Sequence, residues 1–385
     1  MEISDLRIAL TSGNYNYTRD GANKSLNRLV GYLLKQGAAV RVYSPVVEHP
    51  AFAPTGDLVG TPAVPIPFRP EYRIPLGLGN RVRADVDAFR PNMIHVSAPE
   101  FLGHSALRYA RQHDLPVVAS VHTRFDTYFR YYNLGFIEPA LTAMLRRFYR
   151  RCDAIVTPSE SMAEVLRAQR MNFDVSIWSR GVEQDLFCPE ARSLEWRRSL
   201  GIADDDVVVG FVGRLVLEKG LDVFAEAIKA LRARGVKHRV LIVGKGPAED
   251  WFAQHVPEAI FAGFQSGKDL GRAVASMDLM LNPSVTETFG NVTLEAMACG
   301  LPVVGANATG TSSLVADGVT GRLIEPADIA GYADALQAYI ENVELRRTAG
   351  EAAVRAAKPY SWDAINETLA ETYLRVIRER AARRG

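Results

Sequence analysis

Two carboxylates mark the stretch of this chain that is best suited to chemistry. Glu287 and Glu295 stand eight positions apart within PSVTETFGNVTLEAMACGLP, residues 283–302. A strand pattern precedes this stretch, and a helical pattern follows its glycine. The first N–H groups of such a helix lack internal partners and lie at the positive end of its dipole, so the turn is suited to hold phosphate. Glu287 precedes the turn and Glu295 lies one turn inside the helix, so we expect them to contact different parts of one ligand, such as a sugar and a ribose.

A cationic turn is predicted in the same sheet. Arg214 and Lys219 follow the buried strand pattern VVVGFVG, and Gly220 precedes a helical pattern. A guanidinium can bind a diphosphate through a fork, and a lysine binds it as a point charge. Open α/β sheets bind ligands outside the carboxyl ends of their strands, where both turns are expected. Taken alone, this turn could equally be a solvated charged loop.

The first half of the chain has candidates at equivalent positions. Gly13 and Gly21 flank a polar loop after the first strand pattern, RIAL. The loop lacks a G-x-G-x-x-G fingerprint, so it either closes over a substrate or simply connects two elements. His122 and Thr123 end the strand pattern VVASV. A lone histidine is commonly a packed or surface residue, but its position at a strand end also makes His122 a candidate catalyst.

Strand and helix patterns alternate along the chain and must position these residues. Strand patterns at 92–96, 116–121 and 154–157 alternate with helical stretches, and a second series begins near Asp206. Such alternation predicts an α/β protein with parallel sheets covered on both faces. Prolines cluster between Val46 and Pro75, which favours loop and edge strand there.

Length and composition limit the possible classes of protein. With 385 residues the chain is expected to form two domains. A formal charge of +1 with 23% charged residues argues against wholesale nucleic-acid binding. The three cysteines match no disulfide or metal spacing, which favours a reducing cytosol. We expect no signal peptide and no spanning helix, so any work on a membrane is done from the cytosolic side.

Aromatic and basic residues gather after His122. The segment Arg124–Phe136 places aromatics between arginines, and Arg146–Arg151 adds arginines to a helical pattern. This composition suits an anionic membrane surface, although a core helix with a charged outer face has the same pattern. The acidic run 204–206 precedes a strand, so we interpret it as a solvated turn and not a metal site.

These motifs together resemble the retaining glycosyltransferases of family 4, which have the GT-B fold. The resemblance rests on the EX7E pair Glu287 and Glu295, the GRL-x3-KG turn, DGVTGRLIEP and the His-Thr pair. DGANKSLNRLV, VHTRFD and IWSRGVEQDLF are also similar to the branch that glycosylates membrane lipids such as diacylglycerol. The family implies two Rossmann-like parallel-sheet domains facing a central cleft. These are an acceptor-binding domain over 1–185, a donor-binding domain over 186–360, and a C-terminal helix over 361–385 that crosses back to the first domain.

The resemblance also assigns roles to residues. It implies a catalytic role for His122, Arg214, Lys219 and Glu287. The implied donor-binding residues are Gly13, Gly213, Arg214, Lys219, Gly244, Phe264, Glu287, Thr288, Phe289, Gly290, Asn291, Val292 and Glu295. The implied acceptor-binding residues are Gly21, Asn23, His122, Thr123, Phe125 and Arg180.

The activity implied is transfer of a sugar, with retention, from a nucleotide-sugar to a membrane lipid. A UDP-sugar is expected ahead of GDP-mannose, with no metal and no other cofactor. The protein is expected in the cytoplasm, peripheral on the inner face of the membrane. A soluble or polysaccharide acceptor is the alternative, and fold alone also allows an epimerase or a phosphorylase.

Overall fold

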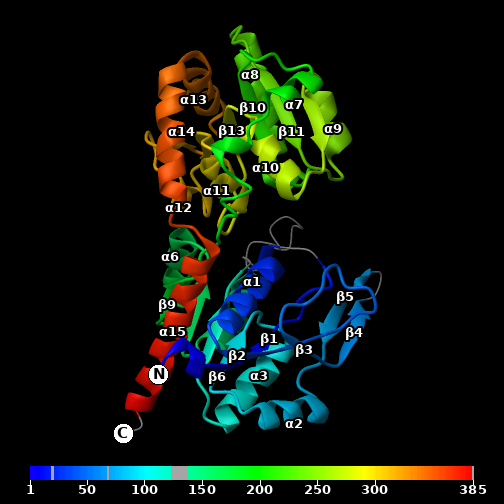
Figure 1. The fold of residues 1–385 in the computed structure, drawn as a ribbon, viewed down its shortest axis with the longest axis vertical. Coiled ribbons are helices and arrows are strands. Elements are labelled where there is room, and N and C mark those ends of the chain that lie inside the picture. The colour runs from blue at the N-terminus through cyan, green and yellow to red at the C-terminus, as the bar shows by residue number, and fades with distance from the viewer. Residues whose placement is uncertain (19–20, 67–68, 123–137, 384–385) are drawn as a thin grey trace. The chain divides into compact units, whose positions relative to one another are not determined.

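The computed structural model describes residues 1–18, 21–66, 69–122 and 138–383, which form two compact units (Figure 1). The first unit comprises Met1–Ser179 together with Trp362–Gly385. The second comprises Arg180–Ser361. The chain therefore leaves its first unit before residue 180 and returns to it with the last helix.

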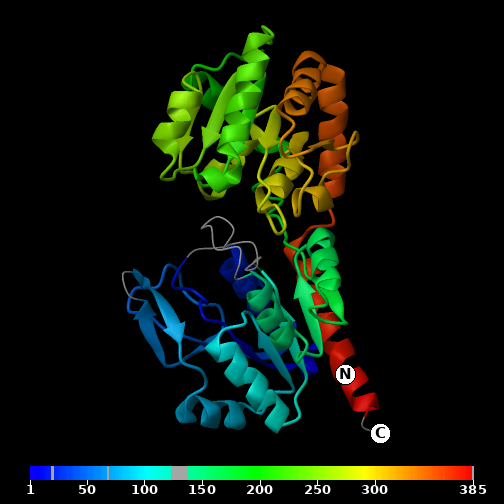
Figure 2. The same cartoon turned by 180° about the vertical axis from the view of Figure 1, so that it is seen from behind.

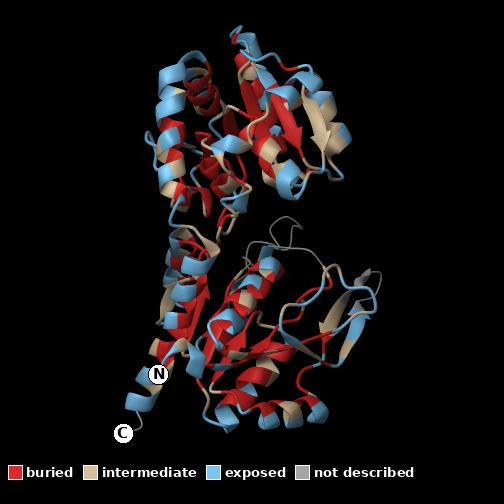
Figure 3. Ribbon diagram, viewed as in Figure 1, coloured by how far each residue is buried: buried red, intermediate tan, exposed pale blue. Residues whose placement is uncertain are grey.

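The core of the first unit is a parallel sheet. Its central strands are short runs such as Met93–Val96 and Ala154–Thr157, in which every residue is buried (Figure 3). Strands buried on both faces lack polar alternation, as these do. Among the described residues the sheet has seven strands, in the spatial order β3 (Asp57–Gly60), β2 (Ala39–Ser44), β1 (Arg7–Thr11), β6 (Met93–Val96), β7 (Val117–Ser120), β8 (Ala154–Thr157) and β9 (Val175–Ile177).

Helices cover both faces of this sheet. One face packs on a core to which α1 and α15 contribute, and these two helices contact each other. The other face packs on α2, α3, α5 and α6; Figure 2 shows α2 and α3 in cyan. The bounds are α1 (Gly21–Lys35), α2 (Asn80–Phe89), α3 (Phe101–Gln112), α5 (Glu138–Tyr149), α6 (Glu160–Ala168) and α15 (Trp362–Ala382).

The proline-rich segment forms more structure than its sequence predicts. It contains the edge strand β3, which pairs with β2, and also an antiparallel hairpin of β4 (Ala63–Ile66) and β5 (Arg69–Pro75). A two-stranded ribbon tolerates prolines because half of its backbone N–H groups need no ladder partner. In α1 the apolar residues Leu26, Leu29, Val30 and Leu33 are buried, whereas Leu34 is 40% exposed.

The second unit is built around another parallel sheet. Its strands β10, β11 and β13 are almost wholly buried, and helices cover both faces. The prediction of two α/β halves with parallel sheets is therefore confirmed. In the described part of the chain the sheet has six strands, in the spatial order β12 (Ile260–Gly263), β11 (Arg239–Val243), β10 (Val208–Val212), β13 (Leu279–Asn282), β14 (Val303–Ala306) and β15 (Gly321–Ile324).

Two cores lie on the faces of this second sheet. The bounds of its helices are α7 (Leu194–Ser199), α8 (Leu221–Ala233), α9 (Glu249–His255), α10 (Gly267–Ala275), α11 (Asn291–Ala298), α12 (Thr311–Leu314), α13 (Ile329–Glu341) and α14 (Val343–Ala357). Helices α8, α9 and α13 share one core, while α10, α11 and the end of α14 contribute to the other. None of the helices in the described ranges is both long and apolar enough to cross a bilayer.

Candidate active site

The strand order of the second sheet brings the two predicted ligand turns together. Strand β10 has β11 on one side and the parallel strand β13 on the other, so the order in which strands are added to the sheet reverses between β10 and β13. Ligands of open α/β proteins bind at such a switch point, outside the carboxyl ends of the strands. Lys219 follows β10 and Glu287 follows β13, and the Lys219 Nζ donates a hydrogen bond of 2.5 Å to Oε1 of Glu287. Their side chains are only 29% and 17% exposed.

A glycine allows these turns to meet. Lys219 ends a single turn of 3-10 helix, Leu217–Lys219, and Gly220 follows in the left-handed region with φ of 73°. A Cβ on Gly220 would lie 2.8 Å from the carbonyl oxygen of Pro283. Any larger residue would push the cationic turn away from the loop that carries Glu287.

The N-terminus of α11 lies in the same loop. Gly290 precedes the helix with φ of 93°, and Phe289 beside it is 4% exposed and packs into the core. Asn282, at the end of β13, donates to the Thr293 hydroxyl of the first turn at 3.0 Å. The strand end and the helix start are therefore tied together. The first N–H groups of α11, which begin at Asn291 and Val292, have no acceptor within the helix and are available to an anion.

A third glycine, at the neighbouring strand end, packs closely against the loop that carries Glu287. Gly310 follows β14, and a Cβ there would lie 2.8 Å from Cβ of Glu287 and 2.9 Å from its carbonyl oxygen. This contact fixes the backbone that carries Glu287. Thr288 and Glu295 are both partly buried, and Glu295 lies in α11 as the sequence predicts.

The remaining donor-binding candidates occupy adjacent strand ends. Gly213 follows β10 and donates its N–H to the Val243 carbonyl at 3.0 Å, while Gly244 donates to the Gly263 carbonyl at 2.9 Å. A Cβ on Gly244 would stand 1.9 Å from the Gly213 oxygen, so the two loops are in backbone contact. Arg214 is exposed at this edge. Phe264, just after β12, is 70% exposed, as a platform for a planar base must be.

The first sheet has its own switch point, between β1 and β6, and there the structure shows a residue that sequence analysis missed. Glu100 follows β6, and its carboxyl accepts a hydrogen bond from the Gly13 N–H. A Cβ on Gly13 would lie 2.0 Å from Oε2 of Glu100. Burial raises the pKa of Glu100 to about 7, against the opposing effect of the Gly13 N–H. A carboxylate four positions after the buried strand pattern 92–96 was the signal that could have revealed it.

The other acceptor-binding candidates lie in different surroundings. His122 follows β7 and is hydrogen-bonded through Nε2 to the Ser120 hydroxyl at 2.8 Å. Gly21 begins α1, and the buried Asn23 donates to the Thr18 carbonyl at 3.0 Å. Arg180 is buried and begins the second unit. Thr123 and Phe125 lie outside the described residues.

Helix α5 carries apolar residues on its inner face and arginines on its outer face. Leu145, Phe148 and Tyr149 are buried in the core of the first unit. Arg147 is exposed, whereas Arg146 is partly buried and donates to the Gln169 carbonyl at 2.8 Å. The structure therefore shows the core-helix arrangement, with several arginines still facing solvent. The segment Arg124–Phe136 falls outside the described residues.

The acidic run at 204–206 is held by arginines. Asp204 pairs with Arg198, and Asp206 lies 3.5 Å from Arg239. Within the described ranges no cluster of three or more histidine, cysteine or acidic residues could hold a metal ion.

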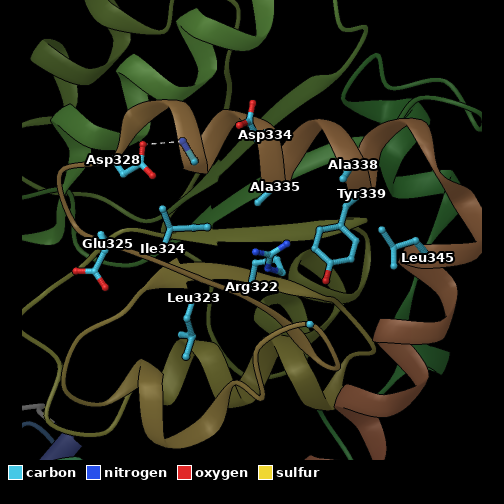
Figure 4. A pocket seen from close by; sticks show the side chains of 12 residues that line it. Arg322, Leu323, Ile324, Glu325, Asp328, Asp334, Ala335, Ala338, Tyr339 and Leu345 are labelled. Carbon is cyan, nitrogen blue, oxygen red and sulfur yellow. Dashed lines mark hydrogen bonds between the residues drawn. The ribbon is translucent and has the colours of Figure 1, made fainter.

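A cavity of about 570 Å³ opens elsewhere on the second unit, between β15 and α13 (Figure 4). Arg322, Glu325 and Tyr339 are among its lining residues. Of the donor-binding residues predicted in the described chain, none lines it. The switch point at Lys219 and Glu287 is therefore a separate place in the fold.

Both halves of the chain match known families. Residues 206–342 match the family described as "Glycosyl transferases group 1". Residues 19–186 match "Glycosyltransferase Family 4". The first match covers the switch point of the second sheet, and the second covers Gly21 to His122.

Curated relatives match over nearly the whole chain. A "GDP-mannose-dependent alpha-mannosyltransferase" of Mycolicibacterium smegmatis is 32% identical over 98% of this chain and 100% of its own length. The "Sulfoquinovosyl transferase SQD2" of Arabidopsis thaliana is 29% identical over 89% of this chain and 68% of its own length.

Solved structures share the fold. Sucrose-phosphate synthase from Thermosynechococcus elongatus superposes with a TM-score of 0.78 at 20% identity, over 97% of this chain and 99% of that chain. Anabaena Alr3699/HepE, solved in complex with UDP and glucose, gives 0.70 at 20% identity, over 95% and 99%. The chain thus belongs to glycosyltransferase family 4, has the GT-B fold, and is an enzyme that transfers sugar from a nucleotide-sugar donor.

Proposed function

We propose that this enzyme transfers a sugar from a nucleotide-sugar to a membrane lipid, with retention of configuration at the anomeric carbon. The observation that carries the proposal is the contact between Lys219 and Glu287 beside the N-terminus of α11. A cation, a carboxylate and unpaired backbone N–H groups meet there at one switch point. These groups match the diphosphate and the hydroxyls of a nucleotide-sugar.

Charge stabilisation is the main catalytic device in this proposal. The bond between the anomeric carbon and the donor phosphate oxygen breaks, and negative charge grows on the diphosphate. Lys219, Arg214 and the N–H groups at the start of α11 stabilise that charge. The acceptor oxygen forms the new bond on the same face of the sugar, and its proton passes to the departing phosphate.

The carboxylates hold the donor in this arrangement. Glu287 binds hydroxyls of the transferred sugar, and Glu295, one turn inside α11, binds the ribose. The exposed ring of Phe264 lies under the base. Since cationic side chains neutralise the diphosphate, the reaction proceeds without a metal; transfer that survives a chelator, and is not raised by added Mg²⁺ or Mn²⁺, tests this part.

The donor base has two candidates. A UDP-sugar is the donor that the family resemblance favours. GDP-mannose is the second candidate, because relatives named for it match 96% to 98% of the chain. Thermal shift with a panel of uridine and guanosine diphosphate sugars decides between them, because a bound donor raises the melting temperature by mass action. A shift with guanosine compounds alone would overturn the UDP assignment.

The acceptor is proposed to be a lipid because aromatic and basic groups lie together on the first unit. Phe173 is 94% exposed, and the Arg150 guanidinium lies 5.5 Å from the centre of its ring. Met144 of α5 is 51% exposed beside the arginines of that helix. Exposed apolar groups flanked by arginine suit an anionic bilayer surface.

Vesicle co-sedimentation tests the lipid surface. The protein should sediment with phosphatidylglycerol vesicles and much less with phosphatidylcholine vesicles. Charge reversal at Arg147 and Arg150 should release it, whereas Arg355→Glu, at an exposed arginine of α14, should not. If the protein ignores anionic vesicles but glycosylates a soluble glycan, the lipid assignment is wrong. The anomeric configuration of the product, read by NMR, tests retention.

A further inference from the structure

A buried chain of hydrogen bonds connects the last helix of the protein to His122. The hydroxyl of Tyr373 in α15 lies 2.6 Å from Nδ1 of His95 in β6. Nε2 of His95 lies 3.0 Å from the hydroxyl of Ser120, at the end of β7. The same hydroxyl lies 2.8 Å from Nε2 of His122. Tyr373 and His95 are completely buried and Ser120 is 1% exposed, so water does not compete along the chain.

The hydrogens in this chain can be arranged in three consistent ways. A neutral imidazole has one donor and one acceptor nitrogen, and a serine hydroxyl has a single hydrogen. In one arrangement Tyr373 donates to His95, His95 donates to Ser120, and Ser120 donates to Nε2 of His122. In the second, every bond runs in the reverse direction, and Tyr373 is only an acceptor. In the third, Tyr373 donates to His95 but His95 and His122 both donate to Ser120, whose own hydrogen takes part in none of these bonds.

Burial of Tyr373 and Ser120 selects the first arrangement. Within the described chain, His95 is the one hydrogen-bond partner of the Tyr373 hydroxyl, and the Ser120 hydroxyl has no partner besides His95 and His122. In the second arrangement the phenolic hydrogen, and in the third the Ser120 hydrogen, would be buried without an acceptor, which costs about 1–3 kcal/mol. Burial also lowers the pKa of His95 to about 3, which keeps its ring neutral.

We propose that Tyr373, acting through His95 and Ser120, holds His122 as the neutral tautomer with its proton on Nδ1. Ser120 then donates to Nε2, and Nδ1–H is the hydrogen-bond donor that the ring offers to its surroundings. Tyr373, His95 and Ser120 are positioning residues. Their importance for transfer rests on the proposed function together with the catalytic role that the family resemblance implies for His122.

The packing around the chain holds the two imidazoles in place. The ring of Trp178 makes edge contacts with both, at 6.0 Å from His95 and 5.5 Å from His122. Its Nε1 donates to Oδ1 of Asn366 at 3.4 Å. Asn366 is also in α15, so this helix supplies both the hydroxyl that starts the chain and the amide that orients the tryptophan.

Tautomers are measured directly by two-bond ¹H–¹⁵N spectra of the ¹⁵N-histidine-labelled full chain at pH 8. The His122 and His95 signals are assigned by their loss in His122→Asn and His95→Gln. We expect His122 with its proton on Nδ1 and His95 with its proton on Nε2. In Tyr373→Phe the bias is lost, and His122 should populate the tautomer with its proton on Nε2. A wild-type His122 with its proton on Nε2, or an unchanged tautomer in Tyr373→Phe, would overturn the proposal.

Tyr149→Phe is a matched control. Tyr149 is a buried tyrosine of the same unit whose hydroxyl has no hydrogen-bond partner in the described chain, so its removal should leave the His122 spectrum unchanged. In transfer assays Tyr373→Phe should lower kcat about tenfold at unchanged KM for the donor. An equal loss in Tyr149→Phe would assign the effect to packing and contradict a positioning role. The tautomer result needs no turnover, so it stands even if the proposed acceptor is wrong.

Discussion

Lys219 and Glu287 form a hydrogen bond of 2.5 Å although 68 positions separate them in the chain. The bond exists because β13 lies directly beside β10 in the sheet. It also means that Lys219, the cation proposed to bind phosphate, already has a partner before a donor arrives. In the proposed function a diphosphate shares Lys219 with Glu287, and the sugar hydroxyls donate to the remaining lone pairs of the carboxylate.

Removal of Lys219 should abolish most transfer without unfolding the protein. We expect Lys219→Ala to lower kcat by roughly 10²–10³-fold, because one donor to the developing charge is lost. The free energy of unfolding should change by only about 1 kcal/mol, since the pair is partly solvated. Initial rates with labelled donor and thermal melting measure the two effects. Lys229→Ala is the control, because that side chain is 71% exposed on α8 and, among the residues the structure describes, pairs with Glu226 alone. Full activity in Lys219→Ala would remove the basis of the site.

Substitution of Glu287 and substitution of Glu295 should have different effects on donor binding and turnover. Glu287→Gln releases Lys219 from its carboxylate, so calorimetry should show unchanged or tighter binding of the nucleoside diphosphate alone, while kcat falls about 100-fold. Glu295→Gln should instead weaken binding of the nucleoside diphosphate about tenfold and change kcat little. The same loss of nucleotide affinity in both variants would contradict the division of roles.

The position of the loop that carries Glu287 should depend on the absence of a side chain at Gly310. In Gly310→Ala the new methyl group meets the Glu287 backbone, so the loop must move and donor affinity should fall about tenfold. Gly318→Ala separates this effect from backbone strain. Gly318 also has positive φ, 75° against 88° at Gly310, but nothing lies within 4 Å of its would-be Cβ. Both variants should lose some thermal stability, and only Gly310→Ala should lose donor binding. Equal donor affinities in the two variants would refute the argument.

Glu100 should make stability depend on pH. Its pKa is raised from 4.5 to about 7, so between these values the folded state binds more protons than the unfolded state. Stability conferred by the protonated form is complete below pH 4.5 and is lost as pH rises through 7. Glu100→Gln removes this titration and keeps an acceptor for the Gly13 N–H. The variant should have nearly the melting temperature of wild type at pH 4.5 and a higher one at pH 8. The difference in the free energy of unfolding should grow by on the order of 1 kcal/mol per pH unit between pH 4.5 and 7.

Glu226→Gln, at an exposed carboxylate of α8, serves as the control for that titration. The difference in the free energy of unfolding between Glu226→Gln and wild type should stay constant across the same range of pH. If the difference in the free energy of unfolding between Glu100→Gln and wild type is also independent of pH, the Glu100 carboxyl is solvated in the folded protein.

The clustering of much of the candidate donor site could be predicted because its signals are local. A buried strand pattern followed by a glycine and a charged residue marks a strand end, whatever the rest of the chain does. Lys219, Gly290 and Glu287 stand in such patterns, and the structure places all three around one switch point. The hairpin β4–β5 was missed because the rule used for prolines excludes helices but does not choose between a loop and a two-stranded ribbon.

The sequence by itself determined the fold class and the residues at the strand ends, because periodicity reports which face of each element is buried. Only the tertiary structure decided which of these residues touch. Glu100 reaches Gly13 because β6 lies beside β1, and Tyr373 reaches His95 across 278 positions because α15 packs on the first sheet. Contacts of this kind depend on strand order and on where a distant helix docks. Both are set by burial of the whole core, and no local pattern encodes them.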